Sequence, residues 1–320
     1  MCTYNGQRFL PEPLDSLLRQ TEMPDEMVVC DDRSTDATLE ILRNFAAQAT
    51  FPVAIHVNSE QLGPAANFER CFGLCQGEIL LVSDQDDLCF PYRIADSRAA
   101  FAADPALTFV FSDAPLMDET GTDLGRTLYS SAAILGSDRR LLEQGTALTP
   151  VIHRWGMVYG CTLGFRARFL PQALPVPYFW GHDTWIALVL SVLGPSRRLP
   201  RPVTRYRQHP EQAMGADDWS VRNRVRQAHA RTVDEYRLEI RRYELGMEAL
   251  EAHPEVKAKL LPELSARYEF LVKRLEIRSG GWRHASELMS LLVRGEYWRH
   301  GAGFRSVVKD AATMVGAMPR

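Results

Sequence analysis

The stretch Ile79-Leu80-Leu81-Val82-Ser83-Asp84-Gln85-Asp86-Asp87 joins a short apolar run directly to a cluster of carboxylates. The four apolar residues predict a buried strand, because an unbroken run of this length fits a strand that is covered on both faces. A second example occurs upstream, where the apolar residues 27–30 lead into Asp31 and Asp32. In open α/β sheets, ligands bind outside the carboxyl ends of the strands. The sequence therefore predicts a polar site at one edge of a sheet.

Helical and extended patterns alternate through the first 126 residues. Apolar spacing predicts helices over residues 14–18, 39–45 and 67–75, and strands over residues 27–30, 51–57, 79–82 and 109–113. Residues 117–126 have the turn chemistry of a hairpin. Strands that alternate with helices imply a parallel sheet packed on both sides.

The later part of the chain is helical in pattern. Residues 218–277 are rich in Arg, Glu and Leu at helical spacing, with breaks predicted at Pro254 and Pro262, and Gly280-Gly281 opens a last helical segment. Residues 221–320 carry 19 basic and 13 acidic side chains, although the whole chain has a net charge of -3. This balance gives no reason to expect nucleic-acid binding.

Cysteine usage and hydropathy favour a cytoplasmic protein. The six cysteines of the 320-residue chain lack the paired spacing of a zinc site or of a secreted disulfide framework, which predicts a reduced compartment. No signal peptide is visible at the N-terminus. The longest apolar run, residues 185–194, is shorter than the roughly 20 residues of a membrane span.

Carboxylates at a strand end suit a divalent cation such as Mg²⁺ or Mn²⁺, which prefers hard oxygen ligands and can bridge a diphosphate. In an extended segment, Asp84 and Asp86 would point the same way and reach one cation together. Taken alone, residues 84–87 also fit an acidic turn, and Asp31-Asp32 also fit a turn and helix cap.

A colinear set of motifs runs through the first two thirds of the chain. Its segments read Cys2-Thr3-Tyr4-Asn5-Gly6, 14–20, 31–36, 63–68, 83–87, Tyr159-Gly160-Cys161-Thr162, Gly181-His182-Asp183-Thr184-Trp185 and Tyr206-Arg207-Gln208-His209. With these segments the chain resembles the inverting family 2 glycosyltransferases. The resemblance implies a nucleotide-diphospho-sugar transferase fold of GT-A type. This is a single Rossmann-like α/β domain with a mixed central sheet, expected at residues 1–218, before a helical C-terminal extension at residues 219–320.

The resemblance also implies an activity, namely inverting transfer of a sugar from a nucleotide diphosphate-sugar donor, UDP- or dTDP-linked, to a saccharide or lipid-linked acceptor. The motif versions resemble bacterial enzymes of surface-polysaccharide biosynthesis, rhamnosyltransferase-like members included. Such enzymes act in the cytoplasm, and peripheral contact with the inner membrane is a further expectation.

Site residues follow from the same resemblance. On the donor side, Thr3 and Tyr4 would border the nucleotide, Asp32 would hydrogen-bond the base, and Asp84 would lie near the ribose and the metal. The family usually has Gly where this chain has Arg33, which raises a question about the backbone angle there.

Asp86 resembles the principal metal ligand, with Asp87 and His209 as further ligands, and Arg207 would clamp the phosphates. Asp183 would be the base that takes the acceptor proton, although it also suits the N-cap of a helix over residues 184–193.

The segment Gly160-Cys161-Thr162 would be a strand, lying either against the donor sugar or within the core. The family has a longer apolar strand before the motif at Cys2, so the first strand is expected to be truncated.

Three other readings remain as alternatives: a haloacid-dehalogenase-type phosphatase, a receiver-like signalling domain and a non-catalytic nucleotide-sugar-binding module. The first two need a lysine, and the chain has none before Lys257. The joint presence of Asp86 and Asp183 argues against the third.

The last fifty residues combine 9 basic and 4 acidic side chains with aromatic and apolar ones. They fit either a helix on an anionic membrane surface or a helix packed on the catalytic domain.

Overall fold

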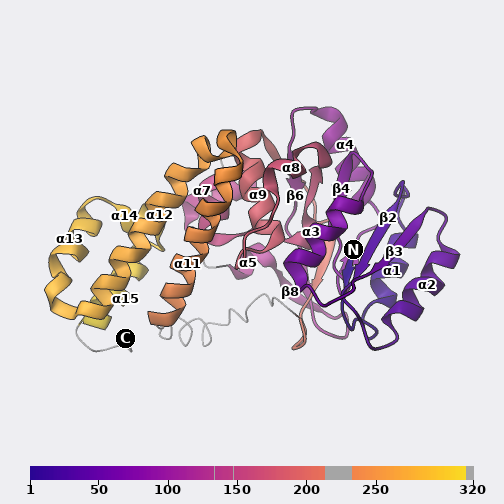
Figure 1. Cartoon of the computed structure of the whole chain (residues 1–320), viewed down its shortest axis with the longest axis horizontal. Helices are drawn as coiled ribbons and strands as arrows, with labels where there is room; N and C mark the ends of the chain where they lie inside the picture. Colours follow the sequence, from indigo (N-terminus) through magenta and orange to yellow (C-terminus); the bar gives the residue numbers. More distant parts are fainter. Residues whose placement is uncertain (133, 147, 213–232, 315–320) are drawn as a thin grey trace.

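A computed structural model describes residues 1–132, 134–146, 148–212 and 233–314 (Figure 1). Its strands form three hydrogen-bonded groups. The first group is parallel and has the order β1 (Cys2–Thr3), β2 (Met27–Asp31), β3 (Val53–Val57). The second has the order β10 (Ser196–Arg198), β6 (Phe109–Phe111), β9 (Gly164–Arg166), β4 (Ile79–Leu81). The third has the order β5 (Leu88–Cys89), β11 (Thr204–Arg207), β7 (Pro115–Met117), β8 (Asp123–Thr127).

The strands run in mixed directions, as the family resemblance implied, and not all in parallel, as the alternation of strands and helices implied. Strand β9 runs antiparallel to both β4 and β6, so the parallel sheet predicted from the pattern is wrong at this position and the mixed sheet is confirmed. The chain reaches β9 from β6 through a hairpin and several helices, a connection that does not impose the parallel direction of a single crossover helix. The predicted hairpin is confirmed, because β7 and β8 pair antiparallel.

Helices cover both faces of the first strand group. The helices of this half are α1 (Pro11–Leu18), α2 (Thr38–Gln48), α3 (Pro64–Leu74) and α4 (Arg93–Ala103). Along β2, Val29 joins Leu42 of α2 in one apolar cluster, and Val28 joins Phe68 of α3 in another. Alternate residues of a strand point to opposite faces, and both faces of β2 are apolar. The two-sided packing predicted from the sequence is therefore confirmed.

The middle of the chain ends at a helix whose six central residues, 185–190, are all buried. Its elements are α5 (Leu128–Ser131), α6 (Gly136–Gln144), α7 (Thr149–Trp155), the 3₁₀ turns η1 (Gly160–Thr162) and η2 (Ala167–Phe169), α8 (Leu170–Ala173) and α9 (His182–Leu193). Two predictions are wrong here. Residues 160–162 form a 3₁₀ turn and not a strand, and the N-cap of α9 is Gly181, with Asp183 inside the first turn.

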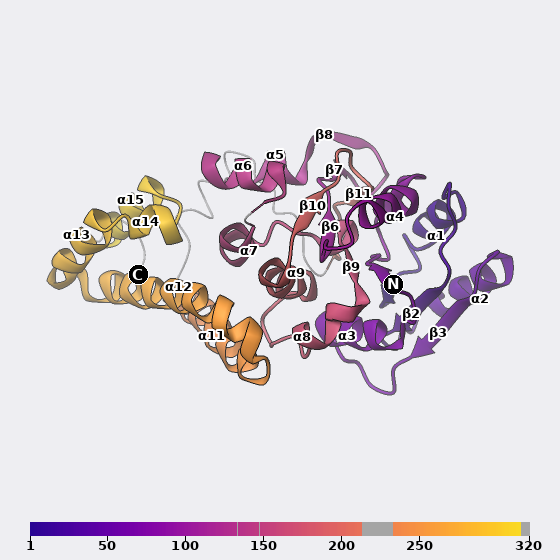
Figure 2. The same ribbon diagram turned by 90° about the horizontal axis from the view of Figure 1, so that it is seen from above.

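The C-terminal helices extend from one end of the α/β part, away from α1 and α2 (Figures 1 and 2). They are α11 (Val233–Ala249), η3 (Leu250–Ala252), α12 (Pro254–Gly280), η4 (Gly281–His284), α13 (Ala285–Val293), α14 (Glu296–His300) and α15 (Phe304–Met314). Pro254 begins α12, as predicted, but the break predicted at Pro262 is wrong. Pro262 lies inside α12 between the fully buried Leu260 and Leu264, whose packing offsets the lost backbone hydrogen bond.

The helical region shares the main core of the protein. Tyr243 of α11 and Leu264 of α12 belong to the same apolar cluster as Trp185 of α9. The boundary predicted between residues 218 and 219 lies outside the described residues. Among the helices that the structure describes, none has both the length and the apolar character needed to cross a bilayer.

Candidate active site

The loop after β4 separates its carboxylates into two groups. Gln85 and Asp86 form a bend, so the extended segment predicted there is wrong. The carboxylates of Asp84 and Asp87 lie with the thiol of Cys161, with one ligand atom of each within 4.8 Å of the others. Asp86 instead pairs with His209, its Oδ2 lying 2.9 Å from Nε2.

The pair of Asp86 and His209 offers an oxygen and a nitrogen ligand on one side of the loop. The His209 side chain is only 5% exposed, and its ring packs against Phe9 with the centroids 4.4 Å apart. Its Nδ1 has no hydrogen-bond partner within the described part of the chain. The Asp86 side chain retains 18% exposure, so it faces the solvent side of the pair. The two side chains fit one divalent cation.

Several carboxylates lie close together in the loop after β4. Burial raises the pKa of Asp84 to about 7, and the carboxylates of Asp86 and Asp183 add to this effect. Burial also raises the pKa of Asp87 well above its usual range, with Asp86 and Asp84 contributing. The Oδ2 atom of Asp87 has no hydrogen-bond partner among the described residues. A bound cation would offset this repulsion.

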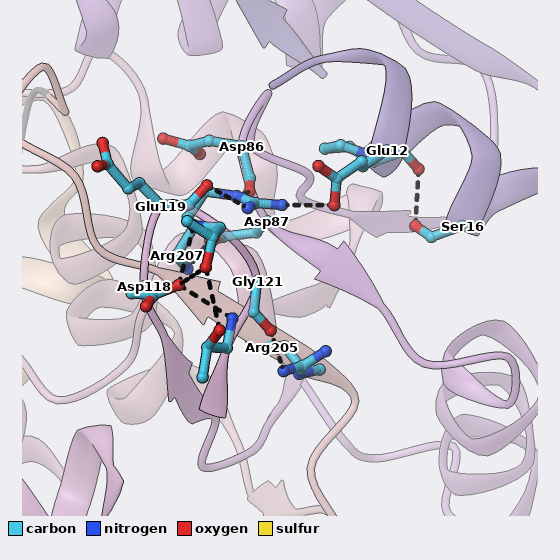
Figure 3. A network of polar contacts seen from close by, with 12 residues as sticks. Glu12, Ser16, Asp86, Asp87, Asp118, Glu119, Gly121, Arg205 and Arg207 are labelled. Carbon is cyan, nitrogen blue, oxygen red and sulfur yellow. Dashed lines mark hydrogen bonds and ion pairs between the residues drawn. The ribbon is translucent and has the colours of Figure 1, made fainter. Parts of the chain in front are cut away.

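Arg207 fixes the carboxylate loop from the protein side (Figure 3). Its backbone N–H donates to Asp87 Oδ1 at 2.8 Å and its Nε donates to the carbonyl of Asp86 at 2.9 Å. The other guanidinium nitrogens donate to the Glu12 carboxylate at 3.0 Å and to the carbonyl of Glu119 at 3.1 Å. The side chain is 0% exposed, which leaves no open face for the phosphate contact that the resemblance implied.

Gln85 connects this loop to the first strand. Its side-chain amide accepts from the backbone N–H of Tyr4 at 2.9 Å and donates to the Tyr4 carbonyl at 3.1 Å. Tyr4 is 44% exposed, so its side chain is open to a ligand. Thr3 is buried and donates to the Asp31 carboxylate at 2.7 Å, which orients the end of β2.

Asp32 is buried under a neighbouring loop. Its Oδ1 accepts from the backbone N–H of Leu62 and from the Asn58 amide, and its Oδ2 accepts from the backbone N–H of Gly63. These bonds leave little free acceptor capacity for a base. Arg33 adopts φ +65°, the left-handed angle that favours glycine, which answers the question raised by the family pattern.

Asp183 is held by two backbone groups. Its Oδ2 accepts from the N–H of Gly160 at 2.9 Å, and its Oδ1 accepts from the N–H of Thr184 at 2.6 Å. A Cβ added at Gly160 would lie 3.6 Å from Asp84 Oδ2 and 3.1 Å from His182 Nε2. The turn η1 therefore lies between Asp183 and the carboxylate loop, and the small residue lets them approach.

The structure thus brings most of the predicted residues to one edge of the strands. Asp84, Asp86, Asp87, Arg207 and His209 meet around the loop after β4, with Asp183 across Gly160. Thr3 and Asp32 are engaged in hydrogen bonds to other segments of the chain. Sequence reasoning missed three contributors, namely Gln85, Glu12 and Cys161. Gln85 and Cys161 carried a signal, because each lies within a motif of the family resemblance.

The first part of the chain matches a known family model. Residues 1–157 match the model described as glycosyl transferase family 2. Relatives agree with this match. The glycosyltransferase EpsE of Bacillus subtilis is 32% identical over 130 residues, which are 41% of this chain and 47% of EpsE. The dTDP-rhamnosyl transferase RfbG of Shigella flexneri is 32% identical over 103 residues, or 30% of this chain and 35% of RfbG. The chain thus matches about half the length of EpsE.

Solved structures extend the likeness over the whole fold. A structure of S. aureus TarS residues 1–349, in complex with UDP-GlcNAc, superimposes with a TM-score of 0.53. The match covers 99% of this chain and 89% of that chain, at 15% sequence identity. The expected GT-A type fold with a C-terminal helical region is confirmed. Family model and relatives agree, and residues 1–157 of the chain form a glycosyl transferase family 2 domain.

Proposed function

We propose that the protein is a metal-dependent glycosyltransferase that moves a sugar, with inversion, from a UDP- or dTDP-linked donor to a saccharide or lipid-linked acceptor. The proposal rests on the cluster of Asp84, Asp86 and Asp87 beside His209, with Asp183 on the other side of Gly160. Relatives support a role in cell-surface polysaccharide biosynthesis, because they include a dTDP-rhamnosyl transferase and a poly(ribitol-phosphate) beta-glucosyltransferase of Bacillus spizizenii. The catalytic domain of this proposal is residues 1–218, and residues 219–320 form its helical extension.

Asp86 and His209 would hold a Mg²⁺ or Mn²⁺ ion, with Asp87 supporting them. When bound there, the cation supplies Lewis-acid neutralisation of the leaving diphosphate. The free oxygen of Asp87 and the repulsion that raises the pKa of Asp84 support this assignment. Arg207 is assigned as a positioning residue, since it holds the backbone of both Asp86 and Asp87.

Asp183 would act as the base. Its carboxylate accepts the proton of the acceptor hydroxyl while that oxygen forms a bond to the anomeric carbon. The bond from this carbon to the phosphate oxygen breaks, and its electron pair leaves with the nucleoside diphosphate. Hydrogen bonds from Gly160 and Thr184 hold the carboxylate in one orientation, which favours transfer along a defined line.

Tyr4 would border the nucleotide base through its exposed side chain. Gln85 supports this placement, since it fixes the Tyr4 backbone to the carboxylate loop. Thr3 and Asp32 would then shape the nucleotide pocket from beneath, because their side chains are buried. Asp84, next to η1, would lie between the ribose and the metal.

The C-terminal helices would place the enzyme on the cytoplasmic face of the inner membrane. One side of this region packs on α12 through Leu288, Leu291 and Tyr297, in one apolar cluster with Phe270 and Ile277. The Glu287 side chain is 41% exposed, and the residues of 281–314 that are exposed overall comprise six apolar ones, four arginines and two serines. They are Trp282, Met289, Val293, Trp298, Phe304, Val308, Arg283, Arg294, Arg299, Arg305, Ser286 and Ser290. Apolar and basic groups together suit an anionic bilayer surface.

A panel of nucleotide sugars tests the proposal. The purified protein is incubated with each donor, with Mn²⁺ or with a chelator, and released nucleoside diphosphate is measured. We expect slow hydrolysis of at least one UDP- or dTDP-linked sugar that requires the metal. Binding without turnover for every donor would favour the non-catalytic module instead.

A further inference from the structure

A strained turn precedes the helix that carries Asp183. The backbone N–H of Trp180 donates to the carbonyl of Pro177 at 3.0 Å, which closes a turn over residues 177–180. Phe179 occupies its third position with φ +69°. Turns with a positive angle there usually take Gly or Asn, because a bulky side chain is strained in this conformation. The fold alone gives no reason for a phenylalanine at this position.

The same turn exposes two aromatic rings. Tyr178 is 75% exposed and Phe179 is 47% exposed, with their ring centroids 4.2 Å apart. Leaving adjacent rings in water forgoes the hydrophobic free energy that burial would supply. Strain and exposure therefore coincide in one pair of residues, and strain of this kind is typical of functional sites.

The turn is held rigidly by the residue that follows it. Trp180 is 2% exposed, and its indole N–H donates to the carbonyl of Arg242 at 2.8 Å. Its ring packs on Trp185 and Tyr243, at centroid distances of 5.2 Å and 5.7 Å. The exposed pair is thus presented in a fixed position.

The pair lies close to the carboxylate assigned as the base. A Cβ added at Gly181 would lie 2.7 Å from Asp183 Oδ1, so that the chain two residues after Phe179 touches this carboxylate. Two residues span at most about 7 Å, which places the rings on the order of 10 Å from Asp183. This is the length of a disaccharide.

We propose that Tyr178 and Phe179 form a binding subsite for the acceptor, taking the pyranose ring next to the sugar whose hydroxyl is attacked. The inference rests on the proposed role of Asp183. Rigid aromatic faces offer an apolar surface to the C–H face of a pyranose, and the exposed Tyr178 hydroxyl can hydrogen-bond a sugar hydroxyl. The acceptor is then a saccharide of at least two rings, whether free or carried on a lipid.

Saturation-transfer NMR with two probes, maltose and methyl β-cellobioside, tests the subsite in the presence of Mg²⁺ and UDP or dTDP. We expect signals from the native protein, and about fivefold or greater weakening for Phe179→Gly and for Tyr178→Ala. Phe179→Gly should also melt at an unchanged or higher temperature, because glycine relieves the strain. Trp282→Ala, which removes an exposed ring on η4, should leave the signals unchanged.

Three outcomes overturn the inference: no sugar signal from the native protein, equal signals from native and variant proteins, or a Phe179→Gly melting temperature several degrees below the native value. The last result would make Phe179 a structural residue. Nucleoside diphosphate binding, followed by calorimetry in the same samples, reports separately on the proposed function. If the native protein does not bind the nucleoside diphosphate, the proposed function is contradicted. If it does bind, and the sugar signals do not change when Tyr178 or Phe179 is replaced, only the subsite is contradicted.

Discussion

Replacement of Asp183 by Asn distinguishes a role of this carboxylate as the catalytic base from a purely structural role. Both carboxylate oxygens accept a backbone N–H, Oδ2 from Gly160 and Oδ1 from Thr184. An amide offers one oxygen and one NH₂ group, so it can accept only one of these bonds and turns a donor toward the other N–H. Leaving that buried donor unsatisfied costs about 1–3 kcal/mol. We therefore expect a melting temperature several degrees lower for Asp183→Asn.

Turnover should fall far more than this loss of stability explains. General base catalysis typically contributes 10²–10⁴-fold, roughly, and the amide cannot take the proton. The assay measures release of nucleoside diphosphate with a saturating acceptor, at a temperature well below the melting transition of the variant. Donor binding, followed by calorimetry, should remain close to native, because the proposed base contacts the acceptor and not the donor.

Asp36→Asn is a matched control. The Asp36 carboxylate also accepts one backbone N–H on each oxygen, from Thr38 and from Gln7. This variant should lose less stability, because the N–H of Gln7 is exposed and can bond to water, and it should keep its turnover. Near-native turnover of Asp183→Asn, or an equal loss in both variants, would refute the assignment of Asp183 as the base.

Two further predictions concern a histidine of α7 and the surface of the C-terminal helices. Burial lowers the pKa of His153 to about 2, and the positive charges of nearby Arg267 and Arg154 add to this shift. The neutral ring therefore contributes stability that is fully present above pH about 6.5 and is lost as the pH falls below that value. Between pH 7 and pH 5 the native protein should lose about 2 kcal/mol more than His153→Gln, and parallel declines of the two melting temperatures would contradict this. The native protein should float with phosphatidylglycerol vesicles, and a triple variant that combines Trp282→Ser, Val293→Ser and Phe304→Ser should not. The control Leu238→Ser, which changes an exposed residue of α11, should float normally. Equal flotation of all three proteins would remove the membrane role.

Strand and helix positions in the first half of the fold were predictable because their apolar patterns are local. Met27–Asp31 and Phe109–Phe111 are buried strands, as their unbroken apolar runs indicate, whereas in the strand Ile79–Leu81 only Leu80 is buried. The direction of β9 was not predictable from periodicity, since it depends on how the chain returns to the sheet. Pro262 illustrates the same limit, because burial of its neighbours outweighs a local helix-breaking preference.

The position of the site was predictable, but the partners of its side chains were not. Carboxylates at the ends of β2 and β4 follow directly from the sequence. Whether a carboxylate faces a ligand or a backbone N–H depends on distant loops, as Asp32 shows through its bonds to Leu62 and Gly63. The burial of Arg207 was likewise not predictable from the sequence, because its four hydrogen-bond partners come from three separate segments of the chain.

Metal-dependent donor binding is the central claim, and calorimetry on Asp86→Ala tests it most directly. Asp86 lies on a loop, its carboxylate pairs with His209, and its side chain is 18% exposed, so its removal should change the fold little. We expect the native protein to bind a nucleoside diphosphate with Mn²⁺ and poorly without it. The variant should bind weakly under both conditions while it melts near the native temperature. An Asp86→Ala protein that binds the nucleoside diphosphate with unchanged Mn²⁺ dependence would contradict the account.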